Sequence, residues 1–99
     1  MDIRNVDLNL LVALDALLAE RSVSRAGERL HLSQPATSAL LARLRELFGD
    51  PLLLRGARGM LPTPRALELL GPVKQVLDEI DAIVQPRAAF DPMSAMHTF

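Results

Sequence analysis

The residues best suited to chemistry are a short polar run, Ser33-Gln34-Pro35, and two arginines further along, Arg55 and Arg58. A glutamine amide both donates and accepts hydrogen bonds, which suits bidentate pairing with the edge of adenine. A guanidinium suits phosphate oxygens and the narrow minor groove of A·T-rich duplexes. The chemistry that these residues indicate is therefore non-covalent recognition of a polyanion.

Catalytic and metal-binding patterns are missing from the sequence. It has no cysteine, which excludes disulfides, thiolate–metal sites and cysteine nucleophiles. Two histidines, His31 and His97, are too few for a histidine-based metal cluster, and there is no Gly-rich phosphate loop. Three Phe are the only aromatic residues, which argues against single-stranded nucleic acid as the ligand. We therefore expect neither an enzyme nor a cofactor in this chain.

The charge is unevenly distributed, although the net charge is only −1. Residues 21–65 hold eight arginines against three acidic residues, whereas acidic residues outnumber basic ones on both sides. A basic centre is the asymmetry expected of a nucleic-acid binder; the alternative is a set of solvated helix arginines. No apolar run approaches the roughly 18 residues of a membrane span, so we expect a cytoplasmic, nucleoid-associated protein.

Helix start and stop signals place the polar run at the beginning of a helix. A first helix is expected over residues 7–20 with Asp7 as N-cap, its leucines on one arc and Asn9, Ala13, Ala16 and Glu20 on the other. A second, short helix capped by Ser22 or Ser24 should end near His31. Ser33 then offers a new N-cap, and only a tight turn separates the two helices, which predicts a helix-turn-helix.

The third helix, expected to run to Phe48, has two distinct faces. One is apolar, and the other carries small or lightly charged residues: Pro35, Ser38, Ala39, Ala42 and Glu46. Solvated helix faces are normally rich in Lys and Glu, so this composition indicates that something approaches closely. Gly49-Asp50-Pro51 ends the helix, and two extended segments, 52–55 and 60–62, flank a turn. They predict a β-wing with Arg55 at its base and Arg58 at its tip.

Thr63-Pro64 is a strong start for a final helix that should reach about Gln85. Its apolar residues follow a heptad spacing, and Gly71-Pro72 predicts a kink or a frayed turn. The apolar stripe is either intramolecular core or, as we expect, a seam with a second copy of the chain. The residues predicted for this dimer interface are Leu69, Val73, Val76, Leu77, Ile80 and Ile83.

The predicted fold class is therefore mainly α, a winged helix-turn-helix of three helices and a two-stranded wing, followed by a long dimerisation helix. The residues expected to read bases are Gln34, Pro35, Ser38 and Arg58. Those expected to contact phosphate are Ser24, Arg25, Ser33, Arg43, Arg55 and Thr63. The alternative for Gln34 is a side chain that caps the helix or is solvated. The alternative for the wing arginines is a solvated hairpin. Arg43 and Arg45 could contact phosphate or instead form ion pairs with Glu46, Asp50 or Asp81.

Several runs together resemble the LysR-type transcriptional regulators, within them the branch of nodulation activators and regulators of aromatic-compound degradation. These runs are 7–11, 22–26, 32–36 (Leu-Ser-Gln-Pro-Ala), 43–45 and 48–52, with the wing, the Thr63-Pro64 start and residues 90–99. The resemblance implies a DNA-binding domain at 1–62, a linker helix at 63–86, and at 87–99 the hinge and the truncated start of an effector domain that senses a small-molecule inducer.

The resemblance also implies a homodimer on inverted-repeat operators in double-stranded DNA, with antiparallel linker helices, and a tetramer and RNA polymerase contacts for the full-length regulator. Three positions depart from the family's usual residues: Gly27 stands for Ala, Thr37 for Val, and Ala39 for an Arg or Asn that reaches bases. A competing reading is a helical interaction module whose basic centre binds an acidic protein. It accounts for the apolar stripe but not for the Ser-Gln-Pro helix start or the arginine wing.

Overall fold

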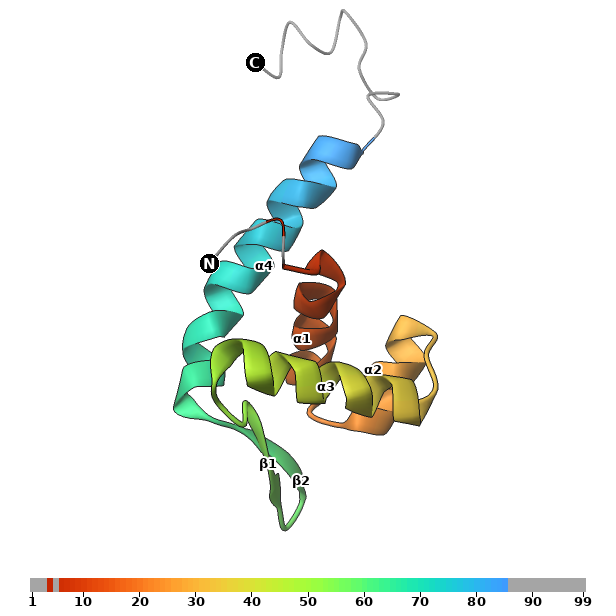
Figure 1. Cartoon of the computed structure of the whole chain (residues 1–99), viewed down its shortest axis with the longest axis vertical. Coiled ribbons are helices and arrows are strands. Elements are labelled where there is room, and N and C mark those ends of the chain that lie inside the picture. The colour runs from red at the N-terminus through yellow and green to blue at the C-terminus, as the bar shows by residue number, and fades with distance from the viewer. Residues whose placement is uncertain (1–3, 5, 86–99) are drawn as a thin grey trace, which may run out of the picture.

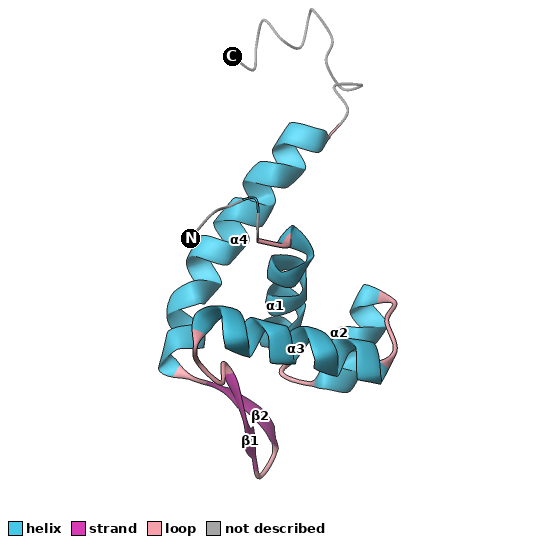
Figure 2. Cartoon of the chain, in the orientation of Figure 1, coloured by secondary structure: helices cyan, strands magenta, loops and turns pink. Residues whose placement is uncertain are grey.

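The computed structural model describes residue 4 and residues 6–85 as four helices and one two-stranded sheet (Figures 1 and 2). In chain order they are α1 (Leu8–Glu20), α2 (Val23–Leu30), α3 (Gln34–Phe48), β1 (Leu53–Gly56), β2 (Gly59–Pro62) and α4 (Pro64–Val84). The predicted winged helix-turn-helix with a long following helix is confirmed. The segment predicted as a hinge, 87–99, lies outside the described residues.

Helix α1 is the centre of the fold and contacts α2, α3 and α4. Asp7 caps it, since the Asp7 carboxylate accepts the backbone N–H of Asn9 at 2.9 Å. Ala13 and Ala16, which were predicted to lie opposite the leucine arc, are buried as well. The reason is tertiary, because a helix enclosed by three others has apolar contacts on more than one side and needs small residues where the neighbours come close.

The helix-turn-helix forms where its caps predicted. Ser22, rather than Ser24, caps α2, because its hydroxyl oxygen accepts the N–H of Arg25 at 3.2 Å. His31 then takes a left-handed conformation that ends α2. Two residues later Ser33 caps α3 by accepting the N–H of Ala36 at 3.2 Å. These local hydrogen bonds fix the angle at which α3 leaves the turn.

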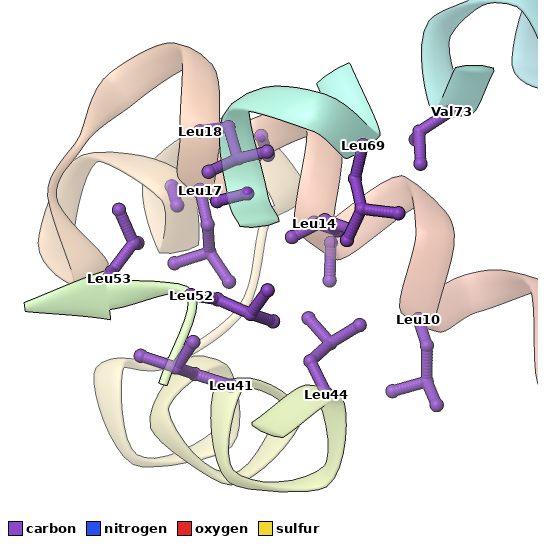
Figure 3. Packing of buried hydrophobic residues seen from close by; sticks show 14 residues of the cluster. Leu10, Leu14, Leu17, Leu18, Leu41, Leu44, Leu52, Leu53, Leu69 and Val73 are labelled. Carbon is purple, nitrogen blue, oxygen red and sulfur yellow. The ribbon is translucent and has the colours of Figure 1, made fainter. Parts of the chain in front are cut away.

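Leucines from α1, α3 and the segment leading into β1 form the core (Figure 3). Leu14 and Leu17 of α1 meet Leu44 of α3 and Leu52, and all four are fully buried. Burial of one such side chain contributes about 1.5–3 kcal/mol. This cluster holds α3 and the base of the wing against α1, so the exposed face of α3 has a fixed direction.

The wing consists of β1, β2 and the turn between them, residues 53–62. The strands are antiparallel, with Arg55 opposite Met60 and Gly56 opposite Gly59. The strand β1 begins and ends one residue later than the predicted segment 52–55, because Leu52 has a left-handed φ of 64° and cannot belong to a strand. The strand β2 begins one residue earlier than the predicted segment 60–62. The tight turn leaves Arg58 exposed at the tip.

Helix α4 begins at its predicted N-cap, where the Thr63 hydroxyl accepts the N–H of Ala66 at 3.1 Å. It passes through Gly71-Pro72 without interruption, so a frayed turn there was wrong. The proline removes only its own N–H from the helical ladder, and Leu69 and Val73 on either side are buried against the core.

The C-terminal half of α4 extends away from the other elements (Figure 1). No helix in the described part of the chain is both long enough and apolar enough to cross a bilayer.

Candidate nucleic-acid interface

The exposed face of α3 has the composition predicted for it. Pro35, Ser38, Ala39, Ala42 and Glu46 are all exposed, whereas Thr37, Leu41 and Leu44 are buried on the opposite side. The two faces arise because the apolar positions recur at helical spacing and α1 covers them. A long, nearly uncharged and small-residue surface of this kind can approach another molecule without steric hindrance from long side chains.

A groove lies between the start of α2, the first half of α3 and the wing. Among its lining residues are Ser24, Gln34, Ser38 and Arg55, four of the predicted site residues from three separate segments. We call this the α3–wing groove. Its floor is formed in part by buried Leu41 and Leu53. The fold therefore brings together polar groups that the sequence placed as far apart as residues 24 and 55.

A second hollow lies beside this groove and is lined by Arg25 and Arg58, two further predicted residues. Arg21 lines both hollows. The sequence assigned Arg21 no role of its own beyond the basic centre. The signal that could have found it is its position directly before the cap Ser22, in the short link between two helices. In the structure Arg21 takes a left-handed conformation there. Four exposed arginines, Arg21, Arg25, Arg55 and Arg58, thus line the two neighbouring hollows, and their guanidinium groups favour an anion on this side of the molecule.

Gln34 is in contact with Ser24 across the helix-turn-helix. The Ser24 hydroxyl donates to the amide oxygen of Gln34 at 3.4 Å, at the long end of hydrogen-bonding distance. Both residues are exposed. This contact orients the Gln34 amide with its nitrogen available as a donor, an arrangement that suits recognition more than helix capping. The capping role belongs to Ser33.

Arg43 lies apart from the α3–wing groove. It faces Asp7, with 4.0 Å between the guanidinium nitrogen and the carboxylate oxygen, and its side chain is 58% exposed. None of the acidic partners considered from the sequence is used. An exposed pair at this distance holds the side chain weakly, so Arg43 can turn to another anion at little cost.

Thr63 has a structural role in this chain, beside which its phosphate contact stays a prediction. The Thr63 side chain is buried, and its hydroxyl donates to Asp50 at 2.7 Å while it accepts the N–H of Ala66. The short bond to the Asp50 carboxylate and the burial of the side chain make the Thr63 hydroxyl less available to a phosphate than the exposed Ser24 hydroxyl.

The hydrogen bond from Thr63 lowers the pKa of the Asp50 carboxyl below its usual 3.8. The Leu52 N–H and the charge of Arg65 act in the same direction, and desolvation opposes them.

Arg45 also serves the fold. Its Nε donates to the carbonyl of Pro51 and its Nη2 to the carbonyl of Leu53, both at 2.8 Å. The sequence offered phosphate or an acidic side chain as its partner, but these bonds go to the backbone at the base of the wing. No sequence pattern predicts such a contact, because it depends on how the chain turns after α3.

The predicted interface of α4 divides into two parts. Leu69 and Val73 are buried in the core of the chain itself, so they leave little surface for a partner. Leu77 packs partly against the same core. Val76 is 39% exposed and Ile83 80% exposed, and Ile80 lies half-buried between them. The intramolecular interpretation of the apolar stripe therefore holds for Leu69 and Val73, and the seam with a second copy of the chain stays a prediction for the exposed half of the helix.

Comparison with known proteins gives a consistent assignment. Residues 8–67 match the family described as bacterial regulatory helix-turn-helix protein, lysR family. Over all 99 residues the chain is 50% identical to the HTH-type transcriptional activator NagR of Ralstonia sp and spans 33% of that protein. It is 48% identical to Nodulation protein D 1 of Bradyrhizobium sp. (strain NC92) and spans 32% of it. The chain thus spans about a third of the length of these curated relatives.

Two solved structures share the fold. A probable transcriptional regulator from Pseudomonas aeruginosa superposes with a TM-score of 0.79 at 38% identity, covering 84% of this chain and 28% of that one. BenM DBD in complex with catB site 1 DNA superposes with a TM-score of 0.74 at 29% identity, covering 80% of this chain and 89% of that one. With its two-faced α3, its arginine wing and these relatives, the chain belongs to the lysR family of bacterial regulatory helix-turn-helix proteins and carries that family's winged helix-turn-helix DNA-binding domain.

Proposed function

We propose that this chain binds double-stranded DNA sequence-specifically, as a homodimer on an inverted-repeat operator, and that it is the DNA-binding part of a regulator of transcription. The observation that carries this proposal is the α3–wing groove, in which Ser24, Gln34, Ser38 and Arg55 meet beside an exposed small-residue helix face. The related fold of BenM DBD in its DNA complex supports it.

In this proposal the start of α3 lies in the major groove, where helix-turn-helix proteins place their recognition helix. Gln34 pairs with adenine through its amide, Ser38 bonds a base from the next turn, and Pro35 contacts a thymine methyl. Arg58 at the wing tip enters the adjacent minor groove. The exposed positions of all four residues support these roles.

Phosphate contacts surround these base contacts and hold the helix in position. Ser24 at the start of α2 and Arg55 at the base of the wing line the α3–wing groove, and Arg25 lines the hollow beside it. Ser33 is the exposed N-cap of α3. Arg43, on the other flank of α3, can contact the far strand once it leaves Asp7. These contacts make affinity fall steeply with salt.

The dimer seam is formed by the exposed half of the α4 stripe, antiparallel to its copy. Val76, Ile80 and Ile83, with Leu77 at the edge, offer apolar surface that residues 6–85 leave uncovered in full or in part. A two-fold pair places two α3 helices on neighbouring turns of DNA, about 34 Å apart. For the full-length regulator we propose a small-molecule inducer, a tetramer and contacts with RNA polymerase.

The test is a selection of bound duplexes from a random library, with heparin as competitor at moderate salt. We expect an inverted repeat to be enriched, and the purified chain to bind it at least about 10³-fold more tightly than shuffled duplex, as specific binders do. A chain that binds shuffled duplex and heparin as well as any selected DNA contradicts the proposal. Binding to an acidic protein instead would favour the helical interaction module.

A further inference from the structure

The base of the wing contains a strained turn centred on Leu52. Its φ is +64°, a value that leucine rarely adopts, and the residue is fully buried. The N–H of Leu53 donates to the carbonyl of Pro51 at 2.6 Å, which closes a three-residue turn around Leu52. Three-residue turns with a positive central φ are rare and strained, and they persist only where the surroundings hold them.

Two charged side chains hold this turn from opposite sides. The Arg45 guanidinium, on α3, donates to both flanking carbonyls, those of Pro51 and Leu53, at 2.8 Å each. The Asp50 carboxylate accepts the N–H of Leu52 at 2.8 Å and the hydroxyl of Thr63 at 2.7 Å. Every backbone polar group from Pro51 O to Leu53 O therefore has a partner, since the Leu52 carbonyl accepts the N–H of Thr63.

These bonds tie the wing to both of the helices beside it. Arg45 projects from the last turn of α3, and Thr63 is the N-cap of α4. The strand β1 begins immediately after the turn, at Leu53, and Arg55 follows two residues later. A rotation at the base of a hairpin moves its tip the most, so the conformation of Leu52 sets where Arg58 stands relative to α3. Charge-assisted bonds of this length are short and directional, which suits a fixed angle.

We propose that Arg45 and Asp50 are positioning residues for DNA recognition: they hold the Leu52 turn and thereby fix the distance between the contacts of α3 and those of the wing tip. The inference rests on the proposed function. Neither side chain needs to touch DNA, and their effect on binding passes through Arg58. A residue that only stabilises the fold behaves differently. After its loss, the molecules that still fold would lose as much DNA affinity from Arg58→Ala as the wild type does.

The experiment is a double-mutant cycle of binding affinities with Asp50→Ala and Arg58→Ala, measured on the selected duplex well below the melting temperature of each variant. In the wild-type background Arg58→Ala is expected to weaken binding about tenfold. In the Asp50→Ala background it is expected to weaken binding about twofold or less, because the tip no longer reaches its place. Asp50→Asn, which keeps the side-chain size and one acceptor oxygen, supplies the cycle if Asp50→Ala does not fold.

Asp78→Ala is the matched control, since Asp78 is an exposed carboxylate on α4 and its loss changes the net charge equally. In this background Arg58→Ala should cost as much as in the wild type. Equal cost in the wild-type, Asp78→Ala and Asp50 backgrounds overturns the positioning role while leaving DNA binding by the wing intact. No cost of Arg58→Ala in the wild type shows instead that the wing tip makes no contact, and then both the proposed contact of Arg58 and this inference fail.

Discussion

Gly27 of α2 and Thr37 of α3 touch across the helix-turn-helix so closely that a Cβ atom on residue 27 would lie 2.8 Å from the Thr37 hydroxyl oxygen. The same Cβ would lie 3.0 Å from the carbonyl oxygen of Leu32. The Thr37 hydroxyl cannot turn away cheaply, because it is buried and donates to the Ser33 carbonyl at 2.8 Å. Both residues depart from those usual in the family that the sequence resembles, so the two departures form one contact.

Gly27→Ala is therefore expected to destabilise the chain, although alanine favours helices by about 1 kcal/mol. Overpacking typically costs about 1–3 kcal/mol, so we expect a net loss of about 1 kcal/mol and a melting temperature about 4–8 °C lower. Thermal unfolding followed by circular dichroism measures this. Glu28→Ala, an exposed change in the same helix, should stay within about 0.5 kcal/mol. A Gly27→Ala variant more stable than wild type would show that α2 and α3 can separate without cost.

The caps and turns of this fold were predictable because their signals are local. Asp7, Ser33 and Thr63 each accept the N–H that their place before a helix predicted. Gly49 ends α3 in a left-handed conformation, as its position after the last periodic residue indicated. The small-residue face of α3 was also predictable, because helical periodicity alone separates it from the buried leucines.

What the sequence did not show depends on residues that meet only in three dimensions. Ala13 and Ala16 are buried because three helices surround α1, and no pattern within α1 indicates three neighbours. Thr63 and Arg45 were both considered for phosphate, but their partners, Asp50 and the backbone after it, come from a turn whose geometry arises from packing. Sequence spacing identified the polar side chains, and the fold decided which of them are structural.

Arg58→Ala is expected to remove a preference for A·T-rich flanking sequence. A guanidinium is held most strongly where the minor groove is narrow, as it is in A-tracts. Wild type should therefore bind an operator with A·T flanks more tightly than one with G·C flanks, and the variant should bind both alike. The slope of log affinity against log salt should also become less steep by about one for each lost contact. Fluorescence anisotropy over a salt series measures both, and an unchanged flank preference would place Arg58 outside the minor groove.

If the proposed dimer seam is correct, Ile83→Glu is expected to convert the dimer to a monomer without unfolding the domain. The side chain is 80% exposed in the single chain, so its replacement should change the free energy of unfolding by less than about 0.5 kcal/mol. In the dimer two glutamates would face an apolar seam, and binding to the inverted repeat should weaken more than binding to a half-site.

Leu67→Glu is the control for this change, because Leu67 is 51% exposed but lies in the first turn of the same helix, outside the stripe. Sedimentation equilibrium measures the oligomeric state. A dimer that survives Ile83→Glu and dissociates with Leu67→Glu would place the seam elsewhere on α4.

Asp50 gives the stability a predictable pH dependence. Its pKa in the folded chain is lowered, first by the Thr63 hydroxyl and then by the Leu52 N–H and Arg65. A lowered folded-state pKa stabilises the fold above the unfolded value of 3.8, and this stabilisation is lost as pH falls through that value toward the folded pKa. The stability difference between wild type and Asp50→Asn should thus be constant near neutral pH and shrink below pH 3.8. Urea unfolding at a series of pH values measures it, and a difference that grows on acidification has the wrong sign.

The central claim is that the start of α3 reads the DNA sequence. Its most direct test compares the affinity of Gln34→Ala for the selected duplex with its affinity for shuffled duplex. We expect a loss of about 1–3 kcal/mol on the selected operator, relaxed preference at one base pair, and almost no loss on shuffled DNA. Gln75→Ala, the same change on the exposed surface of α4, should alter neither affinity. An equal loss on both duplexes after Gln34→Ala would contradict base reading by α3.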